Sequence, residues 1–143
     1  MSAEIIYEDS FPVEGGSFTN AGHVSSRIKT ILKSLGVGND TVRRASIVTY
    51  ESEINIVSYA RKGTIKIAVT SDSVEIDAVD EGPGIADIEQ AMQEGFSTAP
   101  PIVREMGFGA GMGLSNMKKY SDVFEINSEV GVGTHVTMKI VSL

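Results

Sequence analysis

The sequence predicts a single α+β domain in which two amphipathic helices and several alternating strands share one core. Apolar residues recur at helical spacing over 21–35 and over 39–62, and each segment is followed by a glycine. Apolar and polar residues alternate over 63–70 and 73–79, which predicts two antiparallel strands joined by a short turn. With 143 residues, of which 41% are apolar, the chain is long enough for one domain with its own core.

The other elements follow in order along the chain. Residues 3–13 predict an opening strand, and Pro12 favours the edge of a sheet because proline donates no hydrogen bond to a neighbouring strand. Gly36 is expected to end the first helix, and Asn39 or Asp40 to cap the second. The remaining elements are a short helix over 87–94, a long loop over 95–108, a helix over 115–120, and two closing strands over 123–128 and 134–141.

The second helix carries the first candidate residues for chemistry. Glu51 and Asn55 are four residues apart, so both side chains are expected on one helical face. The Glu51 carboxylate can orient or deprotonate a nucleophile, and the Asn55 amide oxygen can ligate a hard cation such as Mg²⁺. Glu53 is out of this register, and we expect it to be a solvated charge.

Glycine-rich motifs follow the strand over 73–79. Asp80 stands at the strand end, where its carboxylate can accept a hydrogen bond from the amino group of a ligand. Gly82 and Gly84 come next and let the backbone turn and approach a ligand closely. Four more glycines at two-residue spacing lead into a helix and can wrap phosphates with backbone N–H groups. They are Gly107, Gly109, Gly111 and Gly113. Gly133 and Thr134 open the last strand.

Composition excludes several other classes of function. The chain has no cysteine, which removes disulfides, thiolate zinc sites and a cysteine nucleophile. Its net charge of −7 argues against nucleic acid or an anionic membrane as the main partner. Neither a membrane-spanning run nor a signal pattern is visible, so a cytoplasmic location is expected. His23 is expected at the surface, and His135 in a packing or edge role on the last strand.

Together, these motifs resemble the GHKL, or Bergerat-fold, ATPase superfamily. The pair Glu51 and Asn55 resembles its N box, Asp80 to Gly84 its G1 box, Gly107 to Gly113 its G2 box, and Thr134 its final GT element. Within the superfamily, the chain looks most like the anti-sigma-factor and switch-protein serine kinases of the RsbW, SpoIIAB and RsbT type. The run from Asn55 to Ala60 is closest to the RsbT type. The resemblance implies a two-layer α+β sandwich over residues 1–143, with a mixed, mostly antiparallel sheet covered on one face by helices.

The resemblance also implies a role for each motif, with ATP and Mg²⁺ as cofactors. Asn55 would hold Mg²⁺, Asp80 would accept from the adenine amino group with support from Thr134, and Glu51 would act on the attacking nucleophile. The glycine motifs would line the nucleotide site. A lid over about 95–113 would open at Ser97 and Thr98, which would also contact the nucleotide. Arg104 in that lid is either a γ-phosphate contact or a solvated charge.

The chain departs from the family pattern in three respects. Ile56 and Tyr59 stand where many anti-sigma kinases have alanine and histidine, which favours the RsbT-like branch and weakens the case for binding a sigma factor. The lid looks extended over 100–106. There is also no lysine in an obvious phosphate-reaching motif.

The leading hypothesis is an ATP-dependent serine/threonine protein kinase that acts as a regulatory switch on a STAS-type antagonist protein. One alternative is an ATP-binding anti-sigma or phosphatase-activating adaptor without kinase turnover. Another is a detached ATPase domain of a histidine kinase. A sigma factor or a phosphatase is a further possible partner, and a homodimer is a possible assembly.

Overall fold

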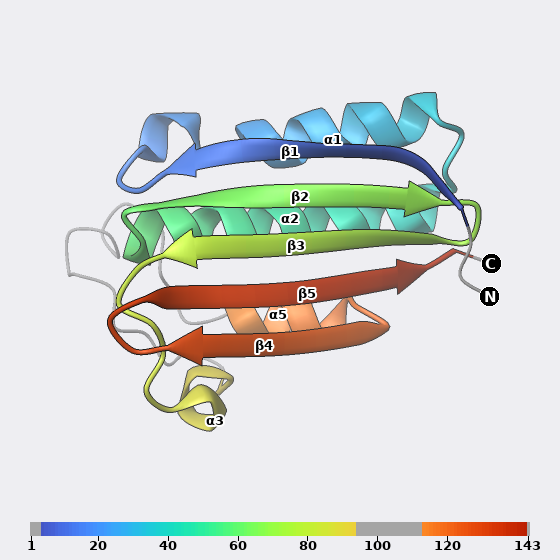
Figure 1. The fold of residues 1–143 in the computed structure, drawn as a ribbon. Coiled ribbons are helices and arrows are strands. Elements are labelled where there is room, and N and C mark those ends of the chain that lie inside the picture. The colour runs from blue at the N-terminus through green and yellow to red at the C-terminus, as the bar shows by residue number, and fades with distance from the viewer. Residues whose placement is uncertain (1–3, 94–112, 143) are drawn as a thin grey trace.

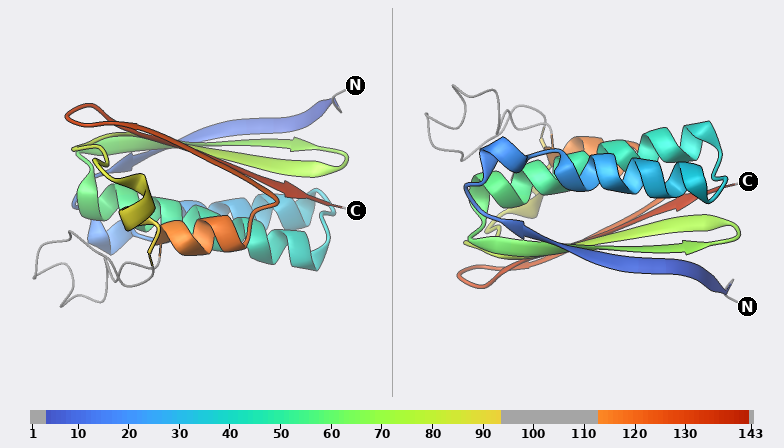
Figure 2. Two further views of the ribbon diagram at one scale, coloured as in Figure 1. Left: turned by 90° about the horizontal axis from the view of Figure 1, so that it is seen from below. Right: turned by 90° about the horizontal axis from the view of Figure 1, so that it is seen from above.

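The computed structural model describes residues 4–93 and 113–142 of the chain, and it has two layers. Five strands form one sheet in the order β1-β2-β3-β5-β4, and all four pairings between neighbours are antiparallel. The strands are β1 (Ile5–Glu14), β2 (Lys62–Thr70), β3 (Ser73–Glu81), β4 (Val123–Glu129) and β5 (Gly133–Val141). The long helices α1 (His23–Ser34) and α2 (Asn39–Tyr59) and the short helix α5 (Gly113–Lys119) cover one face of the sheet (Figures 1 and 2). The expected two-layer α+β sandwich is therefore confirmed.

The strands agree closely with the sequence pattern. β1 lies at one edge of the sheet, as Pro12 predicts, and β2 and β3 form a hairpin around Ser71 and Asp72. Two smaller elements complete the fold. A 3₁₀ turn η1 covers Phe18–Asn20, and α3 is a single turn over Ile88–Ala91. The Asp87 side chain caps α3 by accepting a hydrogen bond from the Gln90 N–H at 3.0 Å.

The end of α1 follows the expected chemistry. Gly36 has a φ of 80°, and its N–H bonds to the Lys33 carbonyl while the Val37 N–H bonds to the Leu32 carbonyl. This pair of bonds is a Schellman motif, which requires a left-handed residue at the position that Gly36 occupies. The predicted stop of the first helix is confirmed.

The two ends of α2 differ from the sequence prediction. Gly38 is the N-cap and Asn39 is already helical, so neither Asn39 nor Asp40 caps the helix. The helix ends at Tyr59 and not near Lys62, because Lys62 and Gly63 are already paired with β3. Pairing within the sheet overrides the helical preference of this segment.

One hydrophobic core lies between the helices and the sheet. Its fully buried members come from α1, α2, β2, β3 and β5 and include Ile28, Leu32, Ala45, Val48, Ile65, Ile76, Met138 and Ile140. The Ser52 hydroxyl lies within this core, bonded to the Val48 carbonyl at 2.7 Å and 3.7 Å from the sulfur atoms of Met117 and Met138. The core therefore joins α2, α5 and β5 directly.

A buried carboxylate joins the first two helices. Glu53 of α2 is 2% exposed, and its two carboxylate oxygens accept hydrogen bonds from the Val24 N–H at 3.1 Å and the Ser25 N–H at 3.2 Å. These N–H groups belong to the first turn of α1, which has no partner for them within the helix. The helix dipole adds to the attraction, because the N-terminal end of a helix favours a negative charge. The prediction that Glu53 is a solvated charge is wrong.

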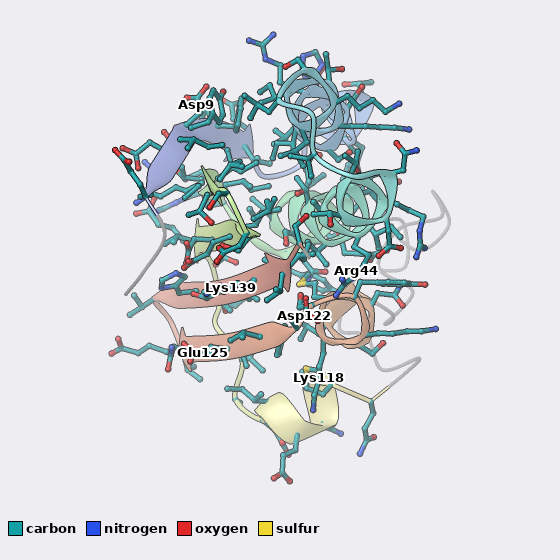
Figure 3. All side chains as sticks on the ribbon, turned by 90° about the vertical axis from the view of Figure 1, so that its right-hand side faces the viewer. Asp9, Arg44, Lys118, Asp122, Glu125 and Lys139 are labelled. Carbon is teal, nitrogen blue, oxygen red and sulfur yellow. The ribbon has the colours of Figure 1, made fainter. Side chains whose placement is uncertain are left out.

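An ion pair anchors the other end of α2. Arg44 contacts Asp122 at 3.0 Å, and its Nε–H donates to the Tyr120 carbonyl at 3.2 Å (Figure 3). The Val141 N–H also donates to Asp122 at 2.7 Å. This hydrogen bond, followed by the one from Arg44, holds the pKa of Asp122 below its ordinary value. α2 is therefore tied to the connection between α5 and β4.

Replacing Glu53 should destabilise the whole fold. We expect Glu53→Ala to lose about 2–4 kcal/mol of unfolding free energy, because two buried N–H groups lose a charged acceptor. Glu53→Gln keeps one acceptor oxygen and should lose less. Urea denaturation followed by circular dichroism measures both, with the exposed Glu125→Ala as the control. If Glu53→Ala unfolds at the same urea concentration as the control, the capping role is wrong.

Candidate functional site

Glu51 and Asn55 lie on the same face of α2, as their spacing predicts, and the first residue of α5 packs against both. A Cβ added to Gly113 would lie 2.9 Å from Asn55 Oδ1 and 3.4 Å from Glu51 Oε2. Any larger residue at Gly113 would therefore press on both side chains. The last residue of the predicted glycine run thus lies directly beside the predicted helical pair.

Glu51 is half-buried beside the start of α5. Burial raises the pKa of its carboxyl group above the ordinary value, and a hydrogen bond from Asn116 opposes that shift. The Asn116 Nδ2 donates to Glu51 Oε1 at 3.4 Å. A carboxylate with a raised pKa is a stronger proton acceptor, which suits a general base. Asn116 was missed by the sequence analysis, although its place three residues after Gly113 on the same helix is a usable signal.

Asp80 lies near the end of β3, as predicted. The Thr134 N–H donates to Asp80 Oδ1 at 3.1 Å. Burial raises the pKa of Asp80, and the hydrogen bond from Thr134 opposes the shift. A Cβ added to Gly82 would lie 3.1 Å from the Ala60 Cα and 3.2 Å from Asp80 Oδ1, so the glycine lets the loop pack closely against both residues.

The loop after β3 is fixed to the hairpin between β4 and β5. Gly84 has a φ of 73°, and a side chain there would collide with the Glu129 carbonyl. The Gly82 N–H donates to the Val132 carbonyl at 3.1 Å, and the Gly131 N–H to the Pro83 carbonyl at 2.8 Å. Gly84 is therefore needed for the backbone of the loop to pack this closely against the hairpin.

Ser128 connects the same loop to the start of β5. Its hydroxyl accepts from the Ile85 N–H at 2.8 Å, donates to the Gly133 carbonyl at 3.1 Å and lies 2.8 Å from the Thr134 hydroxyl. The sequence analysis missed Ser128, because nothing in its local pattern distinguishes it from other polar residues of an alternating strand. Thr134 therefore contributes its N–H to Asp80 and its hydroxyl to Ser128.

The remaining predicted site residues lie outside the described residues. They are Ser97, Thr98, Arg104, Gly107, Gly109 and Gly111, together with most of the predicted lid over 95–113. Of the two histidines, His23 is exposed, and His135 Nε2 lies 2.9 Å from Asp77 Oδ1 on the open face of the sheet. Neither histidine contacts Glu51 or Asp80 in the part of the chain that the structure describes.

The described residues contain neither a membrane-spanning helix nor a cluster of metal-binding side chains. Within residues 4–93 and 113–142, no helix is long and apolar enough to cross a membrane. In the same part of the chain, no three side chains of the His, Cys, Asp and Glu types gather as a metal site.

The raised pKa of Glu51 predicts a pH-dependent stability difference. Because the folded state holds the Glu51 proton more tightly than the unfolded state does, the wild type loses stability as the pH rises above 4.5, the ordinary value of this group. Glutamine does not ionise, so Glu51→Gln should be more stable than the wild type at pH 7. The difference should shrink as the pH falls toward 4.5. Urea denaturation of both proteins across this range measures it, and a pH-independent difference would contradict the prediction.

Comparison with known proteins agrees with this geometry. The family described as histidine kinase-, DNA gyrase B- and HSP90-like ATPase matches residues 23–142. The serine/threonine-protein kinase RsbT of Bacillus subtilis (strain 168) is 40% identical over 114 residues, which are 76% of this chain and 78% of that protein. The anti-sigma F factor of Thermoanaerobacter sp. (strain X514) is 37% identical over 100 residues, or 70% of this chain and 62% of that protein.

A second anti-sigma F factor, from Heyndrickxia coagulans, is 38% identical over 104 residues, which are 72% of this chain and 64% of that protein. The chain thus spans less than two thirds of the length of these two anti-sigma F factors. The family match covers both long helices and all strands except β1. The superfamily expected from the motifs is confirmed. The chain belongs to the histidine kinase-, DNA gyrase B- and HSP90-like ATPase family, and within it is similar to RsbT and the anti-sigma F factors.

Proposed function

We propose that this protein is a Mg-ATP-dependent serine/threonine protein kinase that acts as a regulatory switch. Its substrate is a serine or threonine of a small STAS-type antagonist protein. The observation that carries the proposal is the position of Glu51, a half-buried carboxylate with a raised pKa beside Asn55. The similarity to RsbT, which is named a serine/threonine-protein kinase, supports the same reading.

Asp80 is the proposed acceptor for the adenine amino group. Its carboxylate accepts a hydrogen bond from the Thr134 N–H and lies beside Gly82. A half-buried acceptor of this kind discriminates between ligands, because a ligand without the matching donor leaves the carboxylate unpaired. The nucleotide would then extend from the end of β3 toward the C-terminal end of α2. These two places are close together, because Ala60, the C-cap of α2, borders Gly82 in the loop after β3.

Asn55 is the proposed ligand for Mg²⁺. Its Oδ1 faces the first residue of α5, and a neutral amide oxygen is a hard donor that suits this cation. Magnesium in nucleotide sites is typically held by one or two protein oxygens together with the phosphates, so a single amide is sufficient. When bound, the cation would neutralise charge on the phosphate oxygens during transfer.

A groove on the helical face leads to the same carboxylate. It has a volume of about 400 Å³ and lies between α1 and α2, with Ser25 and Lys29 on one side and Ile47, Tyr50 and Glu51 on the other. Glu51 therefore borders both the groove and the surroundings of Asn55. This arrangement lets a hydroxyl group on another protein approach Glu51 from the helical side.

The proposed reaction is an in-line transfer to that hydroxyl group. Glu51 accepts the hydroxyl proton as the substrate oxygen forms a bond to the γ-phosphorus, and the bond from that phosphorus to the β–γ bridging oxygen breaks. The products are the phosphorylated side chain and ADP. Water can occupy the same position in the absence of a protein substrate, which would give slow ATP hydrolysis.

Nucleotide affinity should depend on Asp80. We expect Asp80→Ala to weaken ATP and ADP equally, by roughly 1–3 kcal/mol, because the adenine amino group loses its acceptor while phosphate and metal contacts remain. Isothermal titration calorimetry measures both constants. Asp77→Ala, three residues earlier on the same strand, is the control and should bind normally. Wild-type affinity in Asp80→Ala would remove the basis for placing adenine there.

Phosphoryl transfer should depend on Glu51. With γ-labelled ATP, Mg²⁺ and a lysate of the source cells, the wild type should label a serine or threonine of a STAS-type protein. Glu51→Gln should bind Mg-ATP nearly as tightly and transfer phosphate roughly 10²–10⁴ times more slowly, the usual effect of removing a general base. Asn55→Ala should lose Mg²⁺-dependent affinity as well as rate. The exposed Glu125→Gln serves as the matched control.

Three results would lead to other conclusions. Wild-type transfer by Glu51→Gln would contradict the kinase mechanism. Nucleotide binding without any transfer of phosphate to protein would favour the adaptor hypothesis, in which bound ATP only controls the binding of a partner protein. Acid-labile labelling of the lysate would indicate a histidine kinase module.

A further inference from the structure

One hydroxyl group of α2 is buried without a hydrogen-bond partner. The Ser58 Oγ is shielded from solvent and has no hydrogen bond to any described residue. A buried hydroxyl in this state lowers the stability of the protein, because the group has lost its bonds to water and gained none. Such groups are rare in folded proteins, and each one calls for a specific explanation.

Three other hydroxyl groups along α2 show how this cost can be avoided. Ser46, Thr49 and Ser52 each donate to the carbonyl group four residues earlier, at 2.7 Å in all three cases. This back-bonding is the usual arrangement for serine and threonine within a helix. Ser58 has the same option toward the Ile54 carbonyl and does not use it. Its hydroxyl is therefore free to bond with something that is not part of the described fold.

The place of Ser58 along α2 indicates what that partner is. Ser58 follows Asn55 by three residues and Glu51 by seven, so the three side chains form one stripe along the helix. Glu51 and Asn55 of this stripe lie beside the start of α5. Two residues beyond Ser58, Ala60 contacts Gly82, which borders the Asp80 carboxylate. Along the helix, Ser58 thus lies between the proposed metal ligand and the loop of the proposed adenine acceptor.

We propose that Ser58 is a nucleotide-binding residue of this protein, whose hydroxyl group donates a hydrogen bond to an oxygen of the bound nucleotide. The acceptor is a phosphate oxygen or a ribose oxygen, and both bind a serine hydroxyl in the same way. The inference rests on the proposed nucleotide site. Binding supplies the missing partner, so the hydroxyl destabilises the free protein and stabilises the complex.

The test separates these two effects in one variant. Ser58→Ala removes the unpartnered group, so the melting temperature of the nucleotide-free protein should stay equal to that of the wild type or rise. The same variant should bind ADP about 2- to 10-fold more weakly, the loss expected for one hydrogen bond. Ser46→Ala, which removes a hydroxyl that is already bonded to the Val42 carbonyl, should leave ADP affinity unchanged. Ser58→Cys keeps a side chain of similar shape, but its thiol is a poor hydrogen-bond donor. This variant should therefore show the same loss of ADP affinity as Ser58→Ala.

Adenosine distinguishes the two acceptors. Weaker binding of both adenosine and ADP to Ser58→Ala places the bond on ribose, and weaker binding of ADP alone places it on phosphate. Unchanged ADP affinity in Ser58→Ala, with a stability equal to or above that of the wild type, would overturn the assignment and leave the nucleotide site standing. If the wild type itself binds no ADP, the proposed nucleotide site fails, and the assignment of Ser58 fails with it.

Discussion

The fold depends on the Glu53 carboxylate, which accepts two N–H groups from the first turn of α1. The N-cap of α1 is Gly22, which has no side chain that could accept a hydrogen bond. The acceptor is instead Glu53, which lies 29 residues after Val24 and 28 residues after Ser25. The same bonds set the rotation of α2 against α1. Glu51 and Asn55 lie on either side of Glu53 in the sequence. The hydrogen bonds of Glu53 to α1 therefore help to orient Glu51 and Asn55 toward the start of α5.

α2 therefore serves three purposes through three faces. Glu53 faces α1, Ser52 lies in the core with Met117 and Met138, and Glu51 faces the start of α5. Glu51 and Glu53 are only two residues apart, yet their side chains have different partners: Asn116 of α5 for Glu51 and the first turn of α1 for Glu53. Burial affects Glu51 through its pKa, while Glu53 is satisfied by backbone donors. The difference between the two carboxylates lies in their partners, since the residue type is the same.

Sequence patterns predicted most of the described helices and strands well, because these depend on local periodicity. Glu51, Asn55 and Asp80 lie where the spacing placed them. The role of Glu53 could not be predicted, because its donors are far along the chain. The same holds for Ser128 of β4, whose contacts join the loop after β3 to β5. The end of α2 was also misplaced, since the pairing of β2 with β3 decides it and helical preference does not.

The loop after β3 and the hairpin between β4 and β5 are joined by backbone hydrogen bonds among Gly82, Pro83, Gly131 and Val132, in addition to the bond to the Ser128 hydroxyl. The side chains of Val130 and Val132 are 64% and 59% exposed and take no part in those bonds. Natural selection can therefore alter the surface at these two positions while leaving the neighbouring Asp80 undisturbed. At Gly84 it has no such freedom, because any side chain meets the Glu129 carbonyl. The side chains at this end of the molecule are therefore variable in a way that its backbone is not.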